Sequence, residues 1–354
     1  MTGTLAASLA AASAHGGPDG GAPIRFDFST NANPYGPPDA LWQAVVQADR
    51  QRYPDPAYRG LRERLAAGHA VAPARIEPAS GGAEAIRRLT LAAQLSGLAE
   101  AWVPQPGFGD YAASAAALGM AVHGYAAAHA LRPERPALVW ACDPCNPTGA
   151  SLGAVEWQAV AAAVERSGSL LAVDAAYDAL RLDGGSQLPA GLADRAWRLQ
   201  CPNKALGLTG VRAAYLIAPA HGAHPDLAGA VARLAPSWVL SAEGQALLLH
   251  WHDAATRAHL EHSRAQLRGD RQALRDAMRR LGWPSCGGSA TPFWLAQAPA
   301  GVDLAALHAR LRAQGIKLRD ATSFGLPGWV RVAAQPAPAV AALLAVLETQ
   351  GGMR

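Results

Sequence analysis

A lysine in the segment CPNKALGLTGVR has the chemical character of an amine nucleophile. The chain contains 31 Lys and Arg residues, and only Lys204 and Lys317 are lysines. Lys204 stands among small and apolar residues, eight positions before Arg212. A buried lysine loses its proton readily and then attacks carbonyl carbons, which arginine does not do. A surface lysine retained by chance is the alternative, and this segment alone does not decide between them. We interpret Lys317 as a solvated strand residue.

Other polar residues with chemical potential follow predicted strands. Asp174 ends the apolar run LLAVD, where an ionised carboxylate needs a partner. Tyr177 follows three residues later, and Asn146 lies in the turn CNPTG. Gly81 and Gly82 precede a predicted helix, and free amides at a helix start can hold a phosphate. Each feature alone also fits an ordinary turn or cap. Combined, an amine, a carboxylate, ring-oxygen donors and a phosphate cradle are what pyridoxal phosphate requires.

The elements that must position these residues alternate between strands and helices. Short apolar runs bounded by Pro, Gly or Asp predict strands at 99–106, 121–126, 136–144, 168–178, 196–202 and 213–219. Helical spacing lies between them. This alternation predicts an α/β fold with a mainly parallel central sheet, helices on both faces, and ligands beyond the carboxyl ends of the strands.

The length of 354 residues predicts more than one subdomain. We expect an N-terminal arm (1–40) that packs on the small domain, a large cofactor-binding domain (41–245) and a small C-terminal α+β domain (246–354). Residues 241–281 carry the pattern of one or two long helices.

Composition excludes several functions. The net charge of +4 is small and the basic residues are scattered, which argues against nucleic acid as a partner. No apolar run is long enough to span a bilayer, and the alanine-rich start lacks a basic residue before Arg25, which argues against a signal peptide. We therefore expect a cytoplasmic protein. Cys142 and Cys145 form a C-x-x-C within a turn, but a second pair is missing, so we expect no metal site.

An ordered set of motifs from about His15 to the end resembles a known family. The motifs are FSTNANPYGPP, RYPDPAYRGLRERLA, GGAEAI, QPGFGDY, CNPTG, VDAAYDAL, NKALGLTGVR and IKLRDATSFGLPGWVRV. They are similar to those of fold-type I pyridoxal-phosphate enzymes, aminotransferase class I/II, and within that group to histidinol-phosphate aminotransferase and the threonine-phosphate decarboxylase of corrinoid (cobalamin) synthesis.

The resemblance implies roles for particular residues. Lys204 would form a Schiff base with the cofactor and move a proton, and Asp174 would pair with the pyridinium nitrogen. Tyr53 would reach the cofactor phosphate of a neighbouring subunit, which implies a homodimer with shared active sites. The other cofactor-binding residues it implies are Gly82, Ala83, Glu84, Phe108, Asn146, Tyr177, Asn203 and Arg212. The substrate-binding residues it implies are Arg331, Arg319, Asn33, His15 and Gly16.

The chain also departs from the patterns of these relatives. Cys201 and Asn203 stand where hydroxyl residues often bind the cofactor phosphate, and Cys201 is a poor substitute. Ala32 replaces the glutamate that is usual in histidinol-phosphate aminotransferases. The run HGG at His15–Gly17 is similar to the decarboxylases, in which it contacts the substrate phosphate. A solvated loop histidine is the alternative for His15.

Three functions remain open from the sequence. We favour transamination of a small, phosphorylated amino acid or amine. Decarboxylation of threonine phosphate is the alternative, because both reactions need the same lysine, aspartate, tyrosine and asparagine. A degenerate scaffold without turnover is the third, and the intact set of Asp174, Tyr177, Lys204, Arg212 and Arg331 argues against it.

Overall fold

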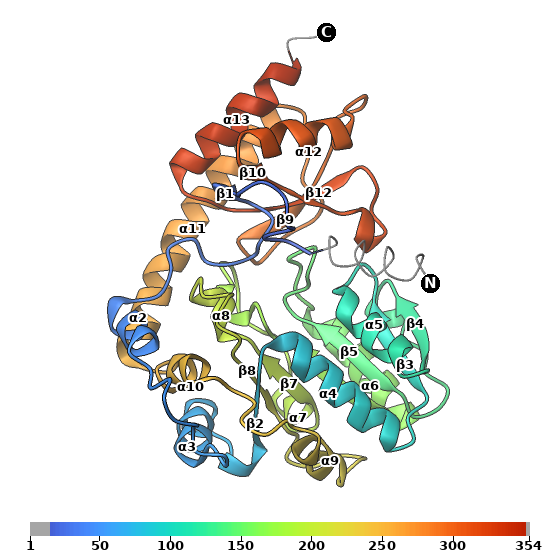
Figure 1. Cartoon of the computed structure of the whole chain (residues 1–354). Helices are drawn as coiled ribbons and strands as arrows, with labels where there is room; N and C mark the ends of the chain where they lie inside the picture. Colours follow the sequence, from blue (N-terminus) through green and yellow to red (C-terminus); the bar gives the residue numbers. More distant parts are fainter. Residues whose placement is uncertain (1–14, 352–354) are drawn as a thin grey trace, which may run out of the picture.

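The computed structural model describes residues 15–351 of the chain. Residues 1–14 of the predicted arm and residues 352–354 lie outside the described part. A seven-stranded sheet and its helices form the larger unit, at the bottom of Figure 1, and two smaller sheets form the unit at the top. Between residues 15 and 351, no helix is long and apolar enough to cross a membrane.

The seven-stranded sheet is mainly parallel, as predicted. Its strands, in order across the sheet, are β2 (Ile76–Ala79), β8 (Ala214–Ile217), β7 (Trp197–Gln200), β6 (Leu170–Asp174), β5 (Leu138–Cys142), β3 (Glu100–Pro104) and β4 (Ala121–Tyr125). The strands from β7 to β4 are parallel, whereas β8 is antiparallel to both of its neighbours. All six predicted strands are present. Strand β2 was not predicted, because Pro78 interrupts its short apolar run, and it lies at an edge where a proline costs little.

Helices cover both faces of this sheet (Figure 1). Alternate residues of β5 contact opposite cores, since Trp140 packs with α4 and α5 while Val139 packs with Trp157 of α6. The helices of the larger unit are α2 (Asp39–Val46), α3 (Arg59–His69), α4 (Gly82–Leu95), α5 (Gly109–Ala117), α6 (Ala154–Ser167), α7 (Ala190–Ala193), α8 (Pro202–Ala205), α9 (Leu227–Arg233) and α10 (Ala242–Leu249). Short 3-10 turns are η1 (Pro73–Arg75), η2 (Ala128–Ala130), η3 (Asp178–Leu180) and η4 (Thr322–Phe324).

The smaller unit has a core of its own. Its elements are β9 (Phe293–Gln297), α12 (Leu304–Ala313), β10 (Ile316–Lys317), β11 (Arg319–Asp320), β12 (Trp329–Ala333) and α13 (Ala337–Gly351). Strands β11, β12 and β9 form an antiparallel sheet, and β1 (Phe26–Asp27), from the predicted arm, pairs in parallel with β10. Helix α10 runs through the predicted boundary at 245/246, and the division into domains stays a prediction.

The 27-residue helix α11 (Ala254–Arg280) belongs to both units. Leu260 and Leu267 lie in the core of the larger unit, whereas Leu274 and Met278 lie in the core of the smaller one. Its amphipathic pattern therefore serves two cores in succession, and this helix physically joins them (Figure 1).

The expectation that Lys317 is solvated is wrong. Its residue exposure is only 9%, its Nζ atom lies 2.8 Å from Asp19 Oδ2, and it also donates to the carbonyl of Gly17. Both partners belong to the N-terminal arm, which covers this strand. The sequence pattern of β10 does not contain this information, because the covering segment is 300 residues away in the chain.

A partly buried histidine at the end of α3 makes stability depend on pH. His69 Nε2 lies 2.6 Å from the hydroxyl of Tyr215 on β8. Burial first, then the nearby His252 and Arg198, lower the pKa of His69 to about 4. Because the pKa is near 6.5 in the unfolded chain, protonation favours unfolding. The contribution to stability is complete above pH 6.5 and is lost as the pH falls from 6.5 towards 4.

We therefore predict that His69→Gln flattens this part of the pH profile. The wild-type protein should lose about 3 kcal/mol more unfolding free energy between pH 7 and pH 4 than the variant loses, from about 1.4 kcal/mol per pKa unit. Urea denaturation at several pH values measures this difference. His262→Gln, at an exposed position on α11, is the control and should keep the wild-type profile. Parallel profiles for wild type and His69→Gln would contradict the prediction.

Candidate active site

A cavity of about 430 Å³ lies between the seven-stranded sheet and the smaller unit. It is bordered by residues at the carboxyl ends of β6 and β7, as expected for a mainly parallel sheet. The structure brings together all but three of the predicted site residues. Those that line the cavity are His15, Gly16, Gly82, Ala83, Phe108, Asn146, Asp174, Tyr177, Asn203, Lys204, Arg212, Arg319 and Arg331.

Glu84 and Asn33 do not line the cavity. The Glu84 carboxylate accepts a hydrogen bond from the Ser80 amide and pairs with Arg88 Nε at 3.1 Å. The Asn33 side chain donates to the carbonyl of Ala205 at 3.0 Å, and its oxygen accepts a hydrogen bond from the Tyr35 amide at 3.1 Å. Both side chains are engaged in holding the backbone near the cavity.

Tyr53 is the third residue away from the cavity. Its side chain is 76% exposed and stacks on Trp238, with ring centroids 4.2 Å apart. Tyr53 therefore does not contact the site of its own chain.

Asp174 is a buried carboxylate with well-defined donors. It ends β6 and is 5% exposed. The hydroxyl of Tyr111 donates to Oδ2 at 2.6 Å, and the amide of Ala176 donates to Oδ1 at 2.9 Å. Tyr111 is itself fixed, because its ring stacks on Trp140 of β5 at 4.8 Å. These two donors fix the orientation of the carboxylate. Sequence reasoning quoted Tyr111 within QPGFGDY but gave it no role.

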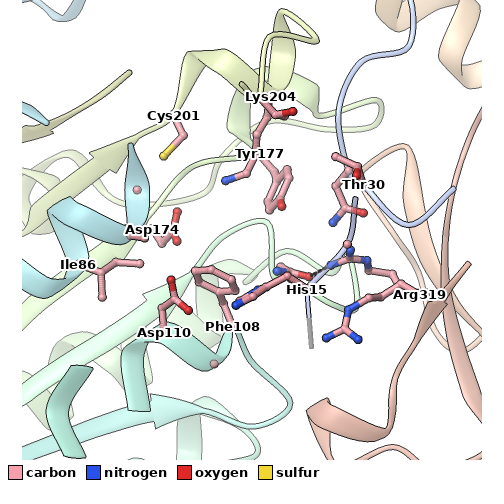
Figure 2. Close-up of a pocket in the computed structure, with 18 of the residues that line it drawn as sticks. His15, Thr30, Ile86, Phe108, Asp110, Asp174, Tyr177, Cys201, Lys204 and Arg319 are labelled. Carbon is pink, nitrogen blue, oxygen red and sulfur yellow. Dashed lines mark hydrogen bonds between the residues drawn. The ribbon is translucent and has the colours of Figure 1, made fainter. Parts of the chain in front are cut away.

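Lys204 extends from the short helix α8 towards Tyr177 and Asp174 (Figure 2). Its Nζ atom lies 4.8 Å from the centre of the Tyr177 ring. Burial acts to lower the pKa of Lys204, but the acidic groups of Tyr177, Cys201 and Asp174 outweigh it and raise the pKa above its usual value. The expectation from burial alone, a lowered pKa, is therefore wrong, because these acidic neighbours favour the ammonium form.

The start of α4 leaves its backbone accessible beside Arg212. Gly81 has a φ of +96°, and a Cβ atom on it would lie 2.3 Å from Arg212 Nη2. A Cβ atom on Gly82 would lie 2.9 Å from the sulfur of Cys201. The Cys201 thiol is neutral near pH 7, because burial raises its pKa to about 11. The Asn203 side chain, also at this end, donates to the carbonyl of Val211 at 3.2 Å.

One wall of the cavity is formed by Phe108 and the N-terminal arm. Phe108 precedes α5, and the His15 ring lies 6.1 Å from it (Figure 2). Asp110, in the first turn of α5, also lines the cavity, and burial raises its pKa. Sequence reasoning missed Asp110, although it lies within the quoted motif QPGFGDY.

Two arginines face each other across the antiparallel pair β11 and β12. Arg319 and Arg331 are in register, and both line the cavity. Arg331 donates to Asn146 Oδ1 and to the carbonyl of Ser29. Burial lowers the pKa of Arg331 to about 10, so it remains a cation at neutral pH. Like charges directly opposite each other are unfavourable, so this pair is suited to hold an anionic group.

Asn31 is a second residue that sequence reasoning missed. It lines the cavity, is 6% exposed, and neither its side-chain nitrogen nor its oxygen has a hydrogen-bond partner. A buried polar group without a partner is costly, and at a cavity wall it points to a ligand. The run NANP contains both Asn31 and Asn33, and the sequence alone does not distinguish the asparagine that faces the cavity.

The site carries no sign of a metal centre. Within residues 15–351, no group of three or more His, Cys, Asp or Glu side chains could hold a metal ion. Cys142 and Cys145 are both free, and Cys142 is buried at the end of β5.

The chain is similar to known proteins over nearly its whole length. Residues 23–348 match the family model of aminotransferase class I and II. Histidinol-phosphate aminotransferase of Thermobifida fusca is 28% identical over 341 residues, which cover 87% of this chain and 85% of that protein.

Solved structures share the fold. L-threonine-O-3-phosphate decarboxylase from Porphyromonas gingivalis has a TM-score of 0.75 at 22% identity, covering 92% of this chain and 99% of its own. A double mutant of Thermus thermophilus aspartate aminotransferase has a TM-score of 0.80 at 21% identity, and the match covers 99% of this chain and 95% of that one. The expected fold-type I architecture is confirmed. The chain therefore belongs to the aminotransferase class I and II family, whose cofactor is pyridoxal phosphate.

Proposed function

We propose that this enzyme is a cytoplasmic, homodimeric transaminase that acts on a small, phosphorylated amino acid or amine, with Lys204 as the residue that binds the cofactor. The observation that carries the proposal is the convergence of Lys204, Asp174 and Asn146 on one cavity that also contains the Arg319–Arg331 pair. The first three suit the cofactor, and the arginines suit an anionic substrate.

The residues present fit pyridoxal phosphate. The cradle beside Arg212 is open only because Gly81 and Gly82 lack a Cβ atom, and it combines a helix start with a guanidinium. When bound, the cofactor withdraws electrons from the substrate carbon attached to the amine. Ionised Asp174 would keep the ring nitrogen protonated, and Asn146 and Tyr177 would contact the ring oxygen.

The remaining residues bind the substrate and move a proton. Phe108 would cover the face of the cofactor ring. Arg331 would grip a carboxylate or phosphate of the substrate, and Arg319 would assist it. Lys204, once its amine is released by the substrate, would take the proton from the substrate carbon and return it.

Replacing Gly81 by alanine tests the cradle. The added methyl group must displace the Arg212 side chain, so we expect Gly81→Ala to lower the affinity for pyridoxal phosphate at least about tenfold, the loss of one charged hydrogen bond. Equilibrium titration followed by cofactor absorbance measures this affinity.

Gly97→Ala is the matched control. Gly97 follows the other end of the same helix with a similar φ of +91°, but a Cβ atom there would contact nothing within 4 Å. Both variants should lose about 1 kcal/mol or more of stability from the positive φ, and Gly81→Ala should lose more, because its ψ of 165° lies in a region that almost only glycine adopts. Only Gly81→Ala should lose cofactor affinity, and equal affinities in the two variants would contradict the proposed cradle.

The substrate end supports a phosphorylated substrate. Asn31 offers an unpartnered amide, and His15 and Gly16 of the arm border the same space. The hydroxyl groups of Ser29 and Thr30, also in the cavity lining, donate to the carboxylate of Asp27 and so fix this turn. The free Asn31 amide, with His15 beside it, suits a phosphate, which offers several acceptor oxygens.

A second function, decarboxylation of threonine phosphate, is favoured by the arm. His15 and Gly16 reach the cavity, and Ala32 removes a carboxylate that histidinol-phosphate aminotransferases usually carry in this motif. Both reactions use the same cofactor residues, so the fate of the substrate carboxylate distinguishes them.

The first experiment adds O-phosphothreonine to cofactor-loaded enzyme without any keto acid. For a transaminase, we expect the cofactor to convert once to its amine form, with no carbon dioxide released. Sustained carbon dioxide release with an unchanged cofactor would contradict the proposal and establish the decarboxylase. If neither occurs, histidinol phosphate is the next substrate. Lys204→Ala is the control and should lose both reactions, and borohydride should attach the cofactor only to a protein that retains Lys204.

The homodimer is supported by exposed aromatic residues. Among the described residues, Trp42, Val46, Tyr53 and Trp238 make up four of the seven exposed large apolar side chains. Of these, Tyr53 and Trp238 stack on each other, and an exposed aromatic pair suits an interface. In a shared-site dimer, Tyr53 of one subunit would contact the cofactor phosphate held by its partner.

Mixing two impaired variants tests the shared site. Lys204→Ala should be inactive, and Tyr53→Ala should have little activity when the cofactor concentration is too low to fill its weakened site. Refolding them together should restore about a quarter of the wild-type sites, because half of the dimers are mixed and each has one intact site. Turnover after mixing measures this. No recovery in a mixture shown to contain mixed dimers would contradict shared active sites.

A further inference from the structure

The N-terminal arm is anchored to the smaller unit by an ion cluster. Asp19 Oδ2 lies 2.8 Å from Lys317 Nζ on β10, and Asp19 Oδ1 lies 3.0 Å from Arg312 Nη2 on α12. Lys317 also donates to the carbonyl of Gly17, and Arg312 donates to that of Ala22. The cluster therefore holds the arm on both sides of Asp19, through side-chain charges and through backbone carbonyls.

Burial of Lys317 distinguishes its contacts from ordinary surface ion pairs, whereas Asp19 and its contact with Arg312 lie at the surface. The side chains of Lys317 and Arg312 are 10% and 19% exposed, and that of Asp19 is 26% exposed. Solvent and salt screen the mutual attraction of shielded charges less than they screen that of exposed charges. Hydrogen bonds from Lys317 and from the Gly21 amide lower the pKa of Asp19 to about 2, so its charge persists at neutral pH.

The anchored segment continues directly into the cavity. The amide of Gly17 donates to Ser29 Oγ at 2.9 Å. Gly16 lies so close to Ser29 that a Cβ atom would be 2.1 Å from the Ser29 carbonyl oxygen. The same oxygen accepts a hydrogen bond from Arg331. The position of His15 and Gly16 is thus tied on one side to the ion cluster and on the other to a substrate-facing arginine.

We propose that Lys317, Asp19 and Arg312 form a clamp that positions the arm, so that His15 and Gly16 close the substrate end of the cavity and strengthen binding of phosphorylated substrates. The three residues do not line the cavity and act only through the arm. The substrate half of this inference rests on the proposed function, whereas the anchoring of the arm does not.

The test compares variants of the loaded enzyme. Lys317→Met keeps the volume of the side chain and removes the charge, and Asp19→Asn removes the charge from the arm. Both should speed amide exchange of residues 16–22. Both should also raise the KM for the phosphorylated compound that the enzyme turns over, O-phosphothreonine or histidinol phosphate, about tenfold, the effect of one charged hydrogen bond. The kcat and the cofactor affinity should stay within about twofold of wild type, because no clamp residue contacts the cofactor region.

Two controls separate positioning from general destabilisation. Lys317→Arg retains the charge and should restore slow exchange and most of the wild-type KM. Arg310→Met changes an exposed arginine on the same helix as Arg312 and should behave like wild type. The KM for the unphosphorylated counterpart, threonine or histidinol, should not change in any variant.

Several outcomes would overturn the clamp. Unchanged exchange of residues 16–22 in Lys317→Met and Asp19→Asn would show that the cluster does not hold the arm. Faster exchange with equal KM increases for phosphorylated and unphosphorylated compounds, or with weakened cofactor binding, would show a general structural role. A wild-type enzyme that does not prefer phosphorylated substrates would contradict the proposed function and the substrate half of this inference, while the exchange rates would still decide whether the cluster anchors the arm.

Discussion

A carboxylate buried near the middle of the large sheet is the constraint on which the site depends. Asp174 carries its charge in a core where an unpaired charge is costly, and the hydroxyl of Tyr111 and the amide of Ala176 offset that cost. Tyr111 reaches Asp174 because α5 follows β3. Its ring is supported by Trp140 of β5, the strand that lies between β3 and β6. The order of strands β3, β5 and β6 thus places a fixed negative charge beneath the cavity, within reach of the electrostatic influence of Lys204.

The central strands and the cofactor residues could be predicted from the sequence, because each has a local signal. Apolar runs bounded by Pro, Gly or Asp indicated six strands, and polar residues just after those strands indicated the site. The direction of β8 and the existence of β2 had no such signal, since both depend on how strands pair. Which surfaces of distant segments meet decides that Asn31, and not Asn33, faces the cavity. The same kind of contact buries Lys317. Sequence spacing does not report such contacts.

The two ends of the cavity are built differently. The cofactor end uses residues of one continuous α/β unit, such as Lys204, Asp174 and Arg212, whose spacing follows from strand order. The substrate end lies at the junction of three remote segments: the arm, the turn around Asn31 and strands β11 and β12. Small changes in any one segment alter this junction without disturbing the sheet. This arrangement explains why the type of cofactor chemistry is easier to infer than the substrate.

Helix α11 has a consequence for how the two cores are spaced. At 1.5 Å per residue, its 27 residues form a rod about 40 Å long, and its two halves are embedded in different cores. Neither half can slide along the helix axis without opening a core, so the helix sets the spacing between the two cores. The arm is attached to the smaller unit through β10 and Lys317. The position of His15 and of the two arginines relative to the large sheet is therefore set by one continuous helix rather than by a flexible linker.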